Sequence, residues 1–161
     1  MAEIIPTEKM KNQYKVLQKV RETLQYFPEF DGKRLIVGHD QYHPGSASLS
    51  DFIISLSKRP KYFTIGHELV HLIQYQFGTI PKGEVQCDIF TIARHELFLD
   101  LEPSYLQWDD KIDWETYKLD IHRICKEGIK LRQENRKYIY WIRKEIEKLS
   151  ILSGKWKDPS D

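Results

Sequence analysis

Apolar residues recur at helical spacing over the first part of the chain. Between Thr7 and Phe27 they fall on one stripe, made of Met10, Tyr14, Leu17, Val20 and Leu24. A stripe that repeats about every 3.6 residues is typical of a helix with one face on a core. Pro6 lies before the segment and Pro28 closes it. The pattern therefore predicts an amphipathic helix over Thr7–Phe27.

Two short segments that follow have the character of strands. The run RLIV over Arg34–Val37 is apolar and ends at Gly38. Over Phe52–Ser57 the side chains alternate, with Phe, Ile and Leu on one face and Ile, Ser and Ser on the other. Alternation of this kind predicts a half-buried strand, and Pro60 ends it. The intervening HDQYHPG is predicted to be a loop.

Two further helices are predicted in the middle of the chain. The first, TIGHELVHLIQYQF, runs from Thr64 as N-cap to Phe77, and Gly78 stops it. The second runs from about Gly83 to Leu99. Because this second segment is apolar on most sides, we expect it to be buried.

The C-terminal third of the chain is strongly helical in composition. Asp100–Asp113 contains Pro103 and is predicted to be a loop, whereas Trp114–Leu149 carries an apolar stripe. As one helix the latter would reach about 50 Å, which is too long for so small a domain. We expect it either to break, near Gly128 or in the polar run KLRQENRK, or to project into a partner subunit. The whole pattern predicts an α+β fold, with a domain over residues 1–113 and a helical extension over residues 114–161.

Composition excludes several classes of protein. The net charge of the 161 residues is +1, so no global field favours nucleic acid or a membrane as partner. No apolar run reaches the roughly 18 residues of a membrane span, and the N-terminus does not resemble a secretory signal. Cys87 and Cys125 lack metal-motif spacing, which favours a reducing, cytoplasmic setting, with a single bridge between them as the alternative. Abundant Lys, Glu and Ile suggest a thermophile.

The first predicted central helix carries an HExxH motif, His67-Glu68-Leu69-Val70-His71. Residues at i and i+4 share a helix face, so both imidazoles can reach one cation. Zinc accepts such nitrogens and lowers the pKa of a bound water to about 7, and Glu68 can then act as general base. The alternative is a chance match on a buried helix, expected in about one or two per cent of such chains.

The second predicted central helix offers a third ligand. Glu84 and Asp88 are also i and i+4, so they place two carboxylates on one face of an otherwise apolar helix. Buried carboxylates need partners, and a metal at Glu84 with a histidine N–H at Asp88 would satisfy both. In the alternative, the acids lie at a partly exposed helix start, where the helix dipole favours them.

Other candidates for the third position are weaker. A metzincin needs Gly at 74 and His at 77, where this chain has Gln74 and Phe77. His95 lies more than about 15 Å along the helix from Glu84, so the two cannot bind one ion. His39 and His43 are i and i+4 in a loop, and we expect ordinary loop histidines, with contact to substrate or an oxyanion as the alternative.

These motifs and their order resemble the gluzincin metallopeptidases. The stretch from Phe52 to Tyr105, including TIGHELVHLIQ, CDIFTIAR and EPSYL, carries most of the resemblance. The short connection between the two helices and the small size are similar to the archaeal minigluzincins. The run ExxCDxFT also resembles ExxADxFA of the ImmA/IrrE group, with Cys87 in place of Ala. The tyrosine or histidine that stabilises the tetrahedral intermediate in larger gluzincins has no clear equivalent.

The resemblance implies a zincin-like fold and a peptide or protein substrate. It further implies zinc ligands at His67, His71 and Glu84, a general base at Glu68 and support of His67 by Asp88. We expect a zinc endopeptidase whose strand at Phe52–Leu56 forms the rim of the cleft and pairs with substrate. One alternative is a regulatory protease that cuts a repressor or a DNA-bound protein, as in the ImmA or SprT-like groups. Another is a non-catalytic module, against which the intact Glu68 argues.

The C-terminal segment is basic and contains aromatic residues. The basic residues are Lys126, Lys130, Arg132, Arg136, Lys137, Arg143, Lys144 and Lys148. The aromatic residues Tyr138, Tyr140 and Trp141 are interleaved with them. Such a mixture can bind nucleic acid, but in a nearly neutral chain a solvated charged helix face is favoured. Minigluzincins occur in latent forms with a shielded cleft. By that resemblance, part of residues 130–161 is predicted to cover the cleft, in the same chain or in a second copy within a homo-oligomer.

Overall fold

The computed structural model describes residues 1–134 and 137–154, which form a four-stranded mixed sheet and a series of helices. The strands are β1 (Glu3–Pro6), β2 (Arg34–His39), β3 (Gly45–Ala47) and β4 (Ile53–Leu56). Their order is β1-β2-β4-β3, with β1, β2 and β4 parallel and β3 antiparallel to β4. The predicted α+β class is confirmed at this level.

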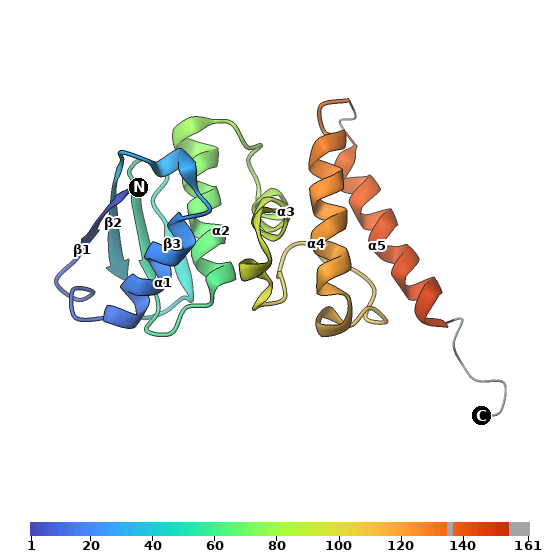
Figure 1. Cartoon of the computed structure of the whole chain (residues 1–161), viewed down its shortest axis with the longest axis horizontal. Coiled ribbons are helices and arrows are strands. Elements are labelled where there is room, and N and C mark those ends of the chain that lie inside the picture. The colour runs from blue at the N-terminus through green and yellow to red at the C-terminus, as the bar shows by residue number, and fades with distance from the viewer. Residues whose placement is uncertain (135–136, 155–161) are drawn as a thin grey trace.

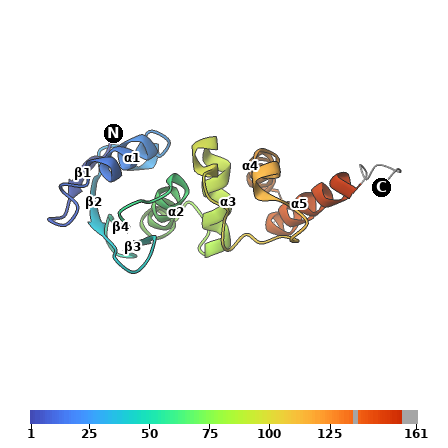
Figure 2. The ribbon, with the colours of Figure 1, turned by 90° about the horizontal axis from the view of Figure 1, so that it is seen from below.

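The helices are arranged in succession beside this sheet. The long ones are α1 (Tyr14–Leu24), α2 (Tyr62–Leu72), α3 (Glu84–Arg94), α4 (Trp114–Leu131) and α5 (Tyr138–Gly154). Three short turns complete the described secondary structure: η1 (Pro28–Phe30), the π turn η2 (Ile73–Phe77) and η3 (Glu96–Leu99). Figures 1 and 2 show the sheet, α2, α3, α4 and α5 following one another along the long axis of the molecule.

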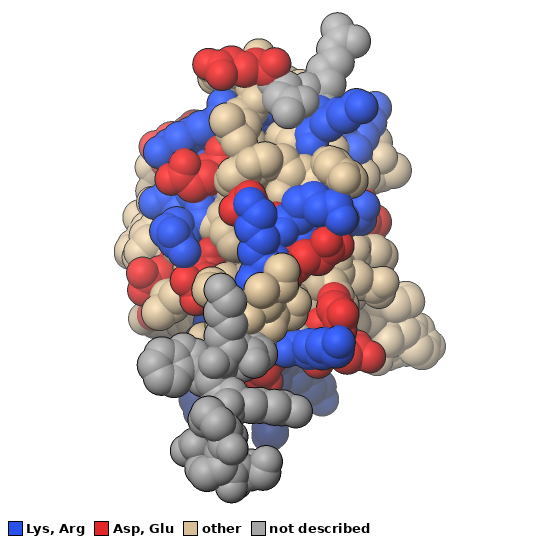
Figure 3. Space-filling model, turned by 90° about the vertical axis from the view of Figure 1, so that its right-hand side faces the viewer, with Lys and Arg blue, Asp and Glu red and all other residues tan. Residues whose placement is uncertain are grey.

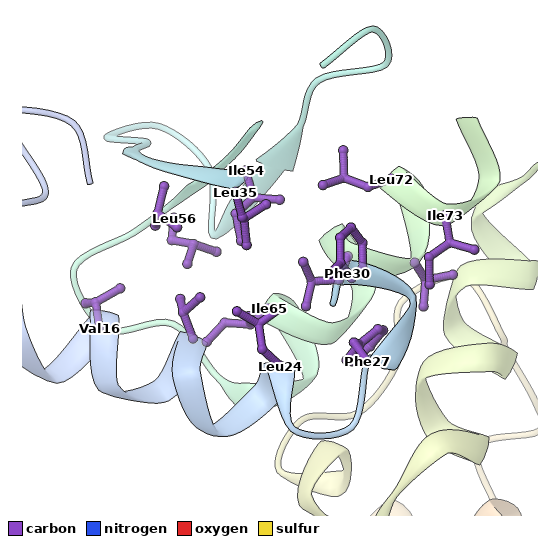
Figure 4. Close-up of a cluster of buried hydrophobic side chains, with 14 of the residues drawn as sticks. Val16, Leu24, Phe27, Phe30, Leu35, Ile54, Leu56, Ile65, Leu72 and Ile73 are labelled. Atoms are coloured by element: carbon purple, nitrogen blue, oxygen red, sulfur yellow. The ribbon is translucent and has the colours of Figure 1, made fainter. Parts of the chain in front are cut away.

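A first apolar core joins the sheet to α1 and α2. Strand side chains such as Leu35 and Ile54 meet Leu24 of α1 and Ile65 of α2, and all are almost fully buried (Figure 4). Met10, Leu17, Val20 and Leu24 of the predicted N-terminal stripe are therefore confirmed as core-facing, whereas Tyr14, at the first turn of α1, is exposed. The helix begins at Tyr14, later than expected, because the chain from Thr7 onward first forms hydrogen-bonded turns.

A second apolar core lies on the other side of α3. It contains Ile89 and Ile92 of α3 together with Ile121 of α4 and Ile142 of α5. Cys87 of the same helix belongs to the first core. Since α3 packs between two cores, it needs apolar residues on most sides, as its sequence predicts. The helix ends at Arg94, earlier than expected, because His95 adopts an extended conformation before η3.

Two strands were not predicted, and one expectation about the sheet is wrong. Neither EIIP of β1 nor GSA of β3 alternates between apolar and polar residues. The β4 strand, expected at the rim of the cleft, lies between β2 and β3, so its backbone is already paired on both sides. The antiparallel edge strand next to α2 is β3 instead.

The C-terminal extension is a helical hairpin. It breaks between Leu131 and Tyr138, within the predicted polar run, and the two helices pack along each other (Figure 1). Its outer face mixes basic and acidic side chains, including the ion pairs Lys144–Glu147 and Lys148–Glu145 (Figure 3). This mixture supports the prediction that the basic residues of the C-terminal segment lie on a solvated, charged helix face. No helix among the described residues combines the length and hydropathy that a membrane crossing needs.

Candidate metal centre

The centre of the site is formed by two histidines of α2 and the first residue of α3. The Nε2 atoms of His67 and His71 each lie 3.0 Å from Oε2 of Glu84. The two imidazoles project from successive turns of one helix, with ring centroids 4.8 Å apart. Glu84 reaches them because the short connection after Gly78 returns the chain to α2. The structure thus brings these three predicted residues together.

Asp88 lies behind the first histidine and is fully buried. Its Oδ1 is 3.0 Å from Nδ1 of His67, in an alignment poor for a hydrogen bond, and neither atom has another partner. Its Oδ2 accepts hydrogen bonds of 2.8 Å from the backbone N–H groups of Tyr105 and Leu106. Burial lowers the pKa of His67, but the carboxylates of Asp88, Glu68 and Glu84 together outweigh burial, so the net shift is upward.

The second histidine is held from its own helix and from α3. Nδ1 of His71 lies 3.1 Å from Oε1 of Gln74 and 3.2 Å from Sγ of Cys87. Burial among carboxylates raises the pKa of the Cys87 thiol well above its usual range. Cys87 and Cys125 are both free thiols, so the alternative of a bridge between them is wrong.

The buried cluster of His67, His71 and Cys87 can hold a metal ion. Two ligand sets are thus available, one completed by Cys87 and one by Glu84. The Cys87 sulfur faces Nδ1 of His71, whereas Glu84 faces Nε2 of both histidines. Ligands about 2 Å from a tetrahedral ion lie roughly 3.3 Å apart, close to the 3.0 Å spacing of the Glu84 set.

The ligand atoms of His67, His71 and Glu84 also fit a cation for electrostatic reasons. If Asp88 and Gln74 accept the Nδ1 protons, both Nε2 atoms present lone pairs toward Oε2 of Glu84. Three acceptors then converge at one point, which is unfavourable unless a cation lies among them. Neutral imidazole and carboxylate are common zinc ligands.

Glu68 lies beside this centre and is 8% exposed. Its pKa is raised to about 7, first because burial penalises the carboxylate and then because Glu84 and Asp40 repel it, while His67 opposes the shift. The edge strand approaches Glu68 closely. A Cβ at Gly45 would lie 2.8 Å from Cγ2 of Thr64 and 3.1 Å from Cγ of Glu68, so only glycine fits there without displacement.

Two hollows flank the centre. One, of about 260 Å³, is lined by Phe63 and Leu101, and the other, of about 440 Å³, by Leu49 and Tyr75. They share His67, Glu68, Gly45 and Tyr105. A larger hollow of about 560 Å³ in the loop before α4 contains none of the predicted site residues.

Tyr105 was not predicted as a site residue. Its ring stacks on His67, with centroids 6.0 Å apart, and it lines both hollows while half exposed. The charge of Glu84 raises the pKa of its phenol. Gln74 was considered only as a departure from the metzincin pattern. Neither residue stands at a motif spacing that would mark it, and only the fold brings Tyr105 to the helix.

The remaining histidines lie outside the centre. His39 contacts the Leu56 carbonyl, and His43 is exposed beside Asp40. His95 stacks on Tyr26 and accepts from the Leu97 N–H.

The predicted cover over the cleft is not seen in the part of the chain that the structure describes. No residue of α4 or α5 lines either hollow beside the histidines. The apolar stripe of α5 packs on α4 instead, through Ile142 and Ile146. Residues 155–161 and Asn135 and Arg136 lie outside the described residues. Cover by these residues or by a second copy stays a prediction.

Comparisons of the chain with protein-family models, with curated proteins and with solved structures found no match.

Proposed function

We propose that this protein is a zinc-dependent peptide hydrolase with a zincin-like fold. The observation that carries the proposal is the convergence of His67, His71 and Glu84 on one point, beside the buried carboxylate of Glu68. A structural metal site needs no such carboxylate. Two histidines, one carboxylate and an open position describe a catalytic zinc site.

His67, His71 and Glu84 would hold the ion, and Cys87 would stay outside the ligand set. When bound, zinc would supply the charge that lowers the pKa of a water to about 7 and polarises the substrate carbonyl. Glu68 takes the proton of the attacking water and passes it to the leaving amine. The phenol of Tyr105 donates a hydrogen bond to the carbonyl oxygen as negative charge develops on it.

The substrate is an extended peptide segment. β3 is the sheet edge beside α2, and its unpaired backbone groups can hydrogen-bond an added strand. The close approach at Gly45 brings such a strand next to Glu68. Apolar side chains on either side of the cleaved bond would enter the two hollows, near Leu101 on one side and Leu49 on the other.

The test combines metal analysis with peptide cleavage. The purified protein should contain about one zinc per chain and cleave peptides from a mixed-sequence library, with new termini identified by mass spectrometry. Glu68→Ala should keep its zinc and lose cleavage, whereas Glu84→Ala should lose zinc. Cleavage that persists in Glu68→Ala would rule out the proposed mechanism. Full zinc affinity in Glu84→Ala, with loss in Cys87→Ala, would instead assign the ligand set to Cys87.

A further inference from the structure

We propose that Gln74 is a positioning residue for the metal centre. It fixes the tautomer of His71 and ties this ligand to the segment that carries Glu84. The inference depends on the metal site of the proposed function, but not on the reaction performed there.

Gln74 lies in the π turn that follows the metal-binding helix and is 1% exposed. It stands three residues after His71, so its side chain can reach back along the same face of the helix. A buried primary amide has two N–H groups and one carbonyl oxygen, all of which need partners. The partners of this amide therefore determine which way it points.

Two backbone carbonyls determine the orientation of the amide. Nε2 of Gln74 donates to the Pro81 carbonyl at 2.6 Å and to the Gly83 carbonyl at 3.0 Å. Carbonyl oxygens only accept hydrogen bonds, so the NH₂ end must face them. The Oε1 end must then face His71 and Cys87, at 3.1 and 3.2 Å.

This orientation decides the tautomer of His71. Because Oε1 can only accept, Nδ1 of the imidazole must carry the proton that points toward it. In the neutral imidazole Nε2 is then unprotonated, and it is the nitrogen that faces Glu84. The Cys87 thiol, close to both Oε1 and Nδ1, donates to the same oxygen. The second ligand nitrogen is thereby prepared for a metal before any metal binds.

The same side chain links the two elements that carry the ligands. Pro81 and Gly83 belong to the connection leading to Glu84, and Gly83 is the N-cap of α3. A shift of this connection would move Glu84 and release the amide of Gln74 together. The neutral amide suits this place, since Glu68, Glu84 and Asp88 already surround the histidines, and a further buried carboxylate would be costly.

The test compares Gln74→Met with Gln76→Met. Methionine keeps the length of the side chain and removes every hydrogen bond. Gln76, from the same turn, bonds only to the exposed Leu49 carbonyl among the contacts described for it, so it is a matched control. Zinc affinity, measured by competition with a chromophoric chelator, should fall about 10- to 100-fold in Gln74→Met and remain unchanged in Gln76→Met. Equal affinities in the two folded variants would overturn the proposal.

A second measurement uses the unmodified, metal-free protein and needs no variant to fold. Imidazole ¹⁵N spectra in mildly basic buffer distinguish the two neutral tautomers. His71 should be a single tautomer with its proton on Nδ1, and Gln74→Met, where folded, should give a mixture. A proton on Nε2 of His71 would overturn the proposal even if the protein binds zinc and cleaves peptides. Failure to cleave any peptide, with His71 in the expected tautomer, would count against the proposed function alone.

Discussion

Asp88 contacts two parts of the centre with its two oxygens. Oδ1 faces His67, and Oδ2 holds the backbone of Tyr105 and Leu106 against α3. The carboxylate thus positions both a metal ligand and the loop that carries the proposed hydrogen-bond donor. This explains how a fully buried acid is accommodated, because each oxygen has a polar neighbour.

Asp88→Asn should separate these two roles. The amide oxygen can still accept from the Tyr105 and Leu106 N–H groups, but its NH₂ would then face the Nδ1 proton of His67. We expect zinc affinity, measured by chelator competition, to fall about 10- to 100-fold while the fold persists. Asp100→Asn is the control, because Asp100 also accepts from two backbone N–H groups, those of Tyr62 and Phe63, away from the metal. A loss of affinity of the same size in both variants would contradict the assignment.

Tyr105→Phe tests the phenol. Removal of one hydrogen-bond donor to a developing oxyanion typically lowers kcat about 10²- to 10³-fold. The ring packing on His67 is kept, so zinc content should not change. Tyr75→Phe is the control, because Tyr75 lines only the 440 Å³ hollow and its phenol lacks the position beside His67. This variant should leave kcat within about twofold. Unchanged kcat in Tyr105→Phe would remove Tyr105 from the mechanism.

At this scale the sequence predicts what is local. His67 and His71, like Glu84 and Asp88, are paired by helical spacing, and the structure brings all four together. The predicted contact between Asp88 and His67 follows from the same spacing once α2 and α3 pack. Tyr105 could not be predicted, because it reaches the site through a loop whose course depends on backbone bonds to Asp88.

At the scale of elements, prediction succeeded where a segment and its flanks show a regular pattern of apolar residues. The helical stripes and the polar break before α5 were recognised, whereas β1 and β3, of four and three residues, were not. Short strands are specified by their partners in the sheet rather than by their own residues. The rim of the cleft was therefore assigned to β4 instead of the edge strand β3.

Gly128 allows α4 and α5 to pack close together. A Cβ at this position would lie 2.5 Å from Cδ1 of Ile142, within the second core. Gly128→Ala should therefore lower the free energy of unfolding by about 1–3 kcal/mol, as overpacking does, despite the better helix propensity of alanine. Urea denaturation measures this. Glu127→Ala, at the exposed neighbouring position, is the control and should change the free energy of unfolding by less than about 0.5 kcal/mol. A stabilised Gly128→Ala would show that the helices separate without cost.

The contact between α1 and α2 should depend on pH. The Tyr62 hydroxyl donates to Glu22, and this bond raises the pKa of Tyr62 from 10.0 to about 12. The folded state thus holds the phenol proton more tightly than the unfolded state. Its contribution to stability is complete below pH 10.0 and is lost as pH rises through about 12. Denaturation midpoints give the difference in stability between the parent and Tyr62→Phe. This difference should shrink as the pH rises over this range. A constant difference would contradict the linkage.

On the scale of the whole molecule, the site lies where the two halves of the structure meet. The first core extends from the sheet through α2 to Cys87 of α3, and the second lies on the other side of α3. The proposed ligands join one residue of α3 to two of α2. Figure 2 shows these helices next to each other at the middle of the long axis. A metal at this position would link α2, which packs on the sheet, to α3, which packs on the C-terminal hairpin. No described residue of the hairpin lines the hollows beside the histidines.

Metal binding should therefore stabilise the second core at a distance. Trp108, Trp114 and Trp141 all belong to or pack on this core, and none lines the hollows at the histidines. A ligand at about 100 times its dissociation constant adds about 2.7 kcal/mol to a cooperative unit. We expect zinc to raise the melting temperature reported by tryptophan fluorescence in a Trp156→Phe background, which removes the tryptophan outside the described residues.

The control for this prediction is His67→Ala, in which zinc should have no effect on the melting temperature. Circular dichroism, which reports all helices, should then give the same transition as tryptophan fluorescence in the parent, with and without zinc. If zinc shifts only the circular dichroism transition, the C-terminal hairpin unfolds independently of the metal-bearing half. In that case α3 would be the boundary between two separate folding units. A shared shift would instead show that α3, packed between both cores, transmits metal binding from α2 to α4.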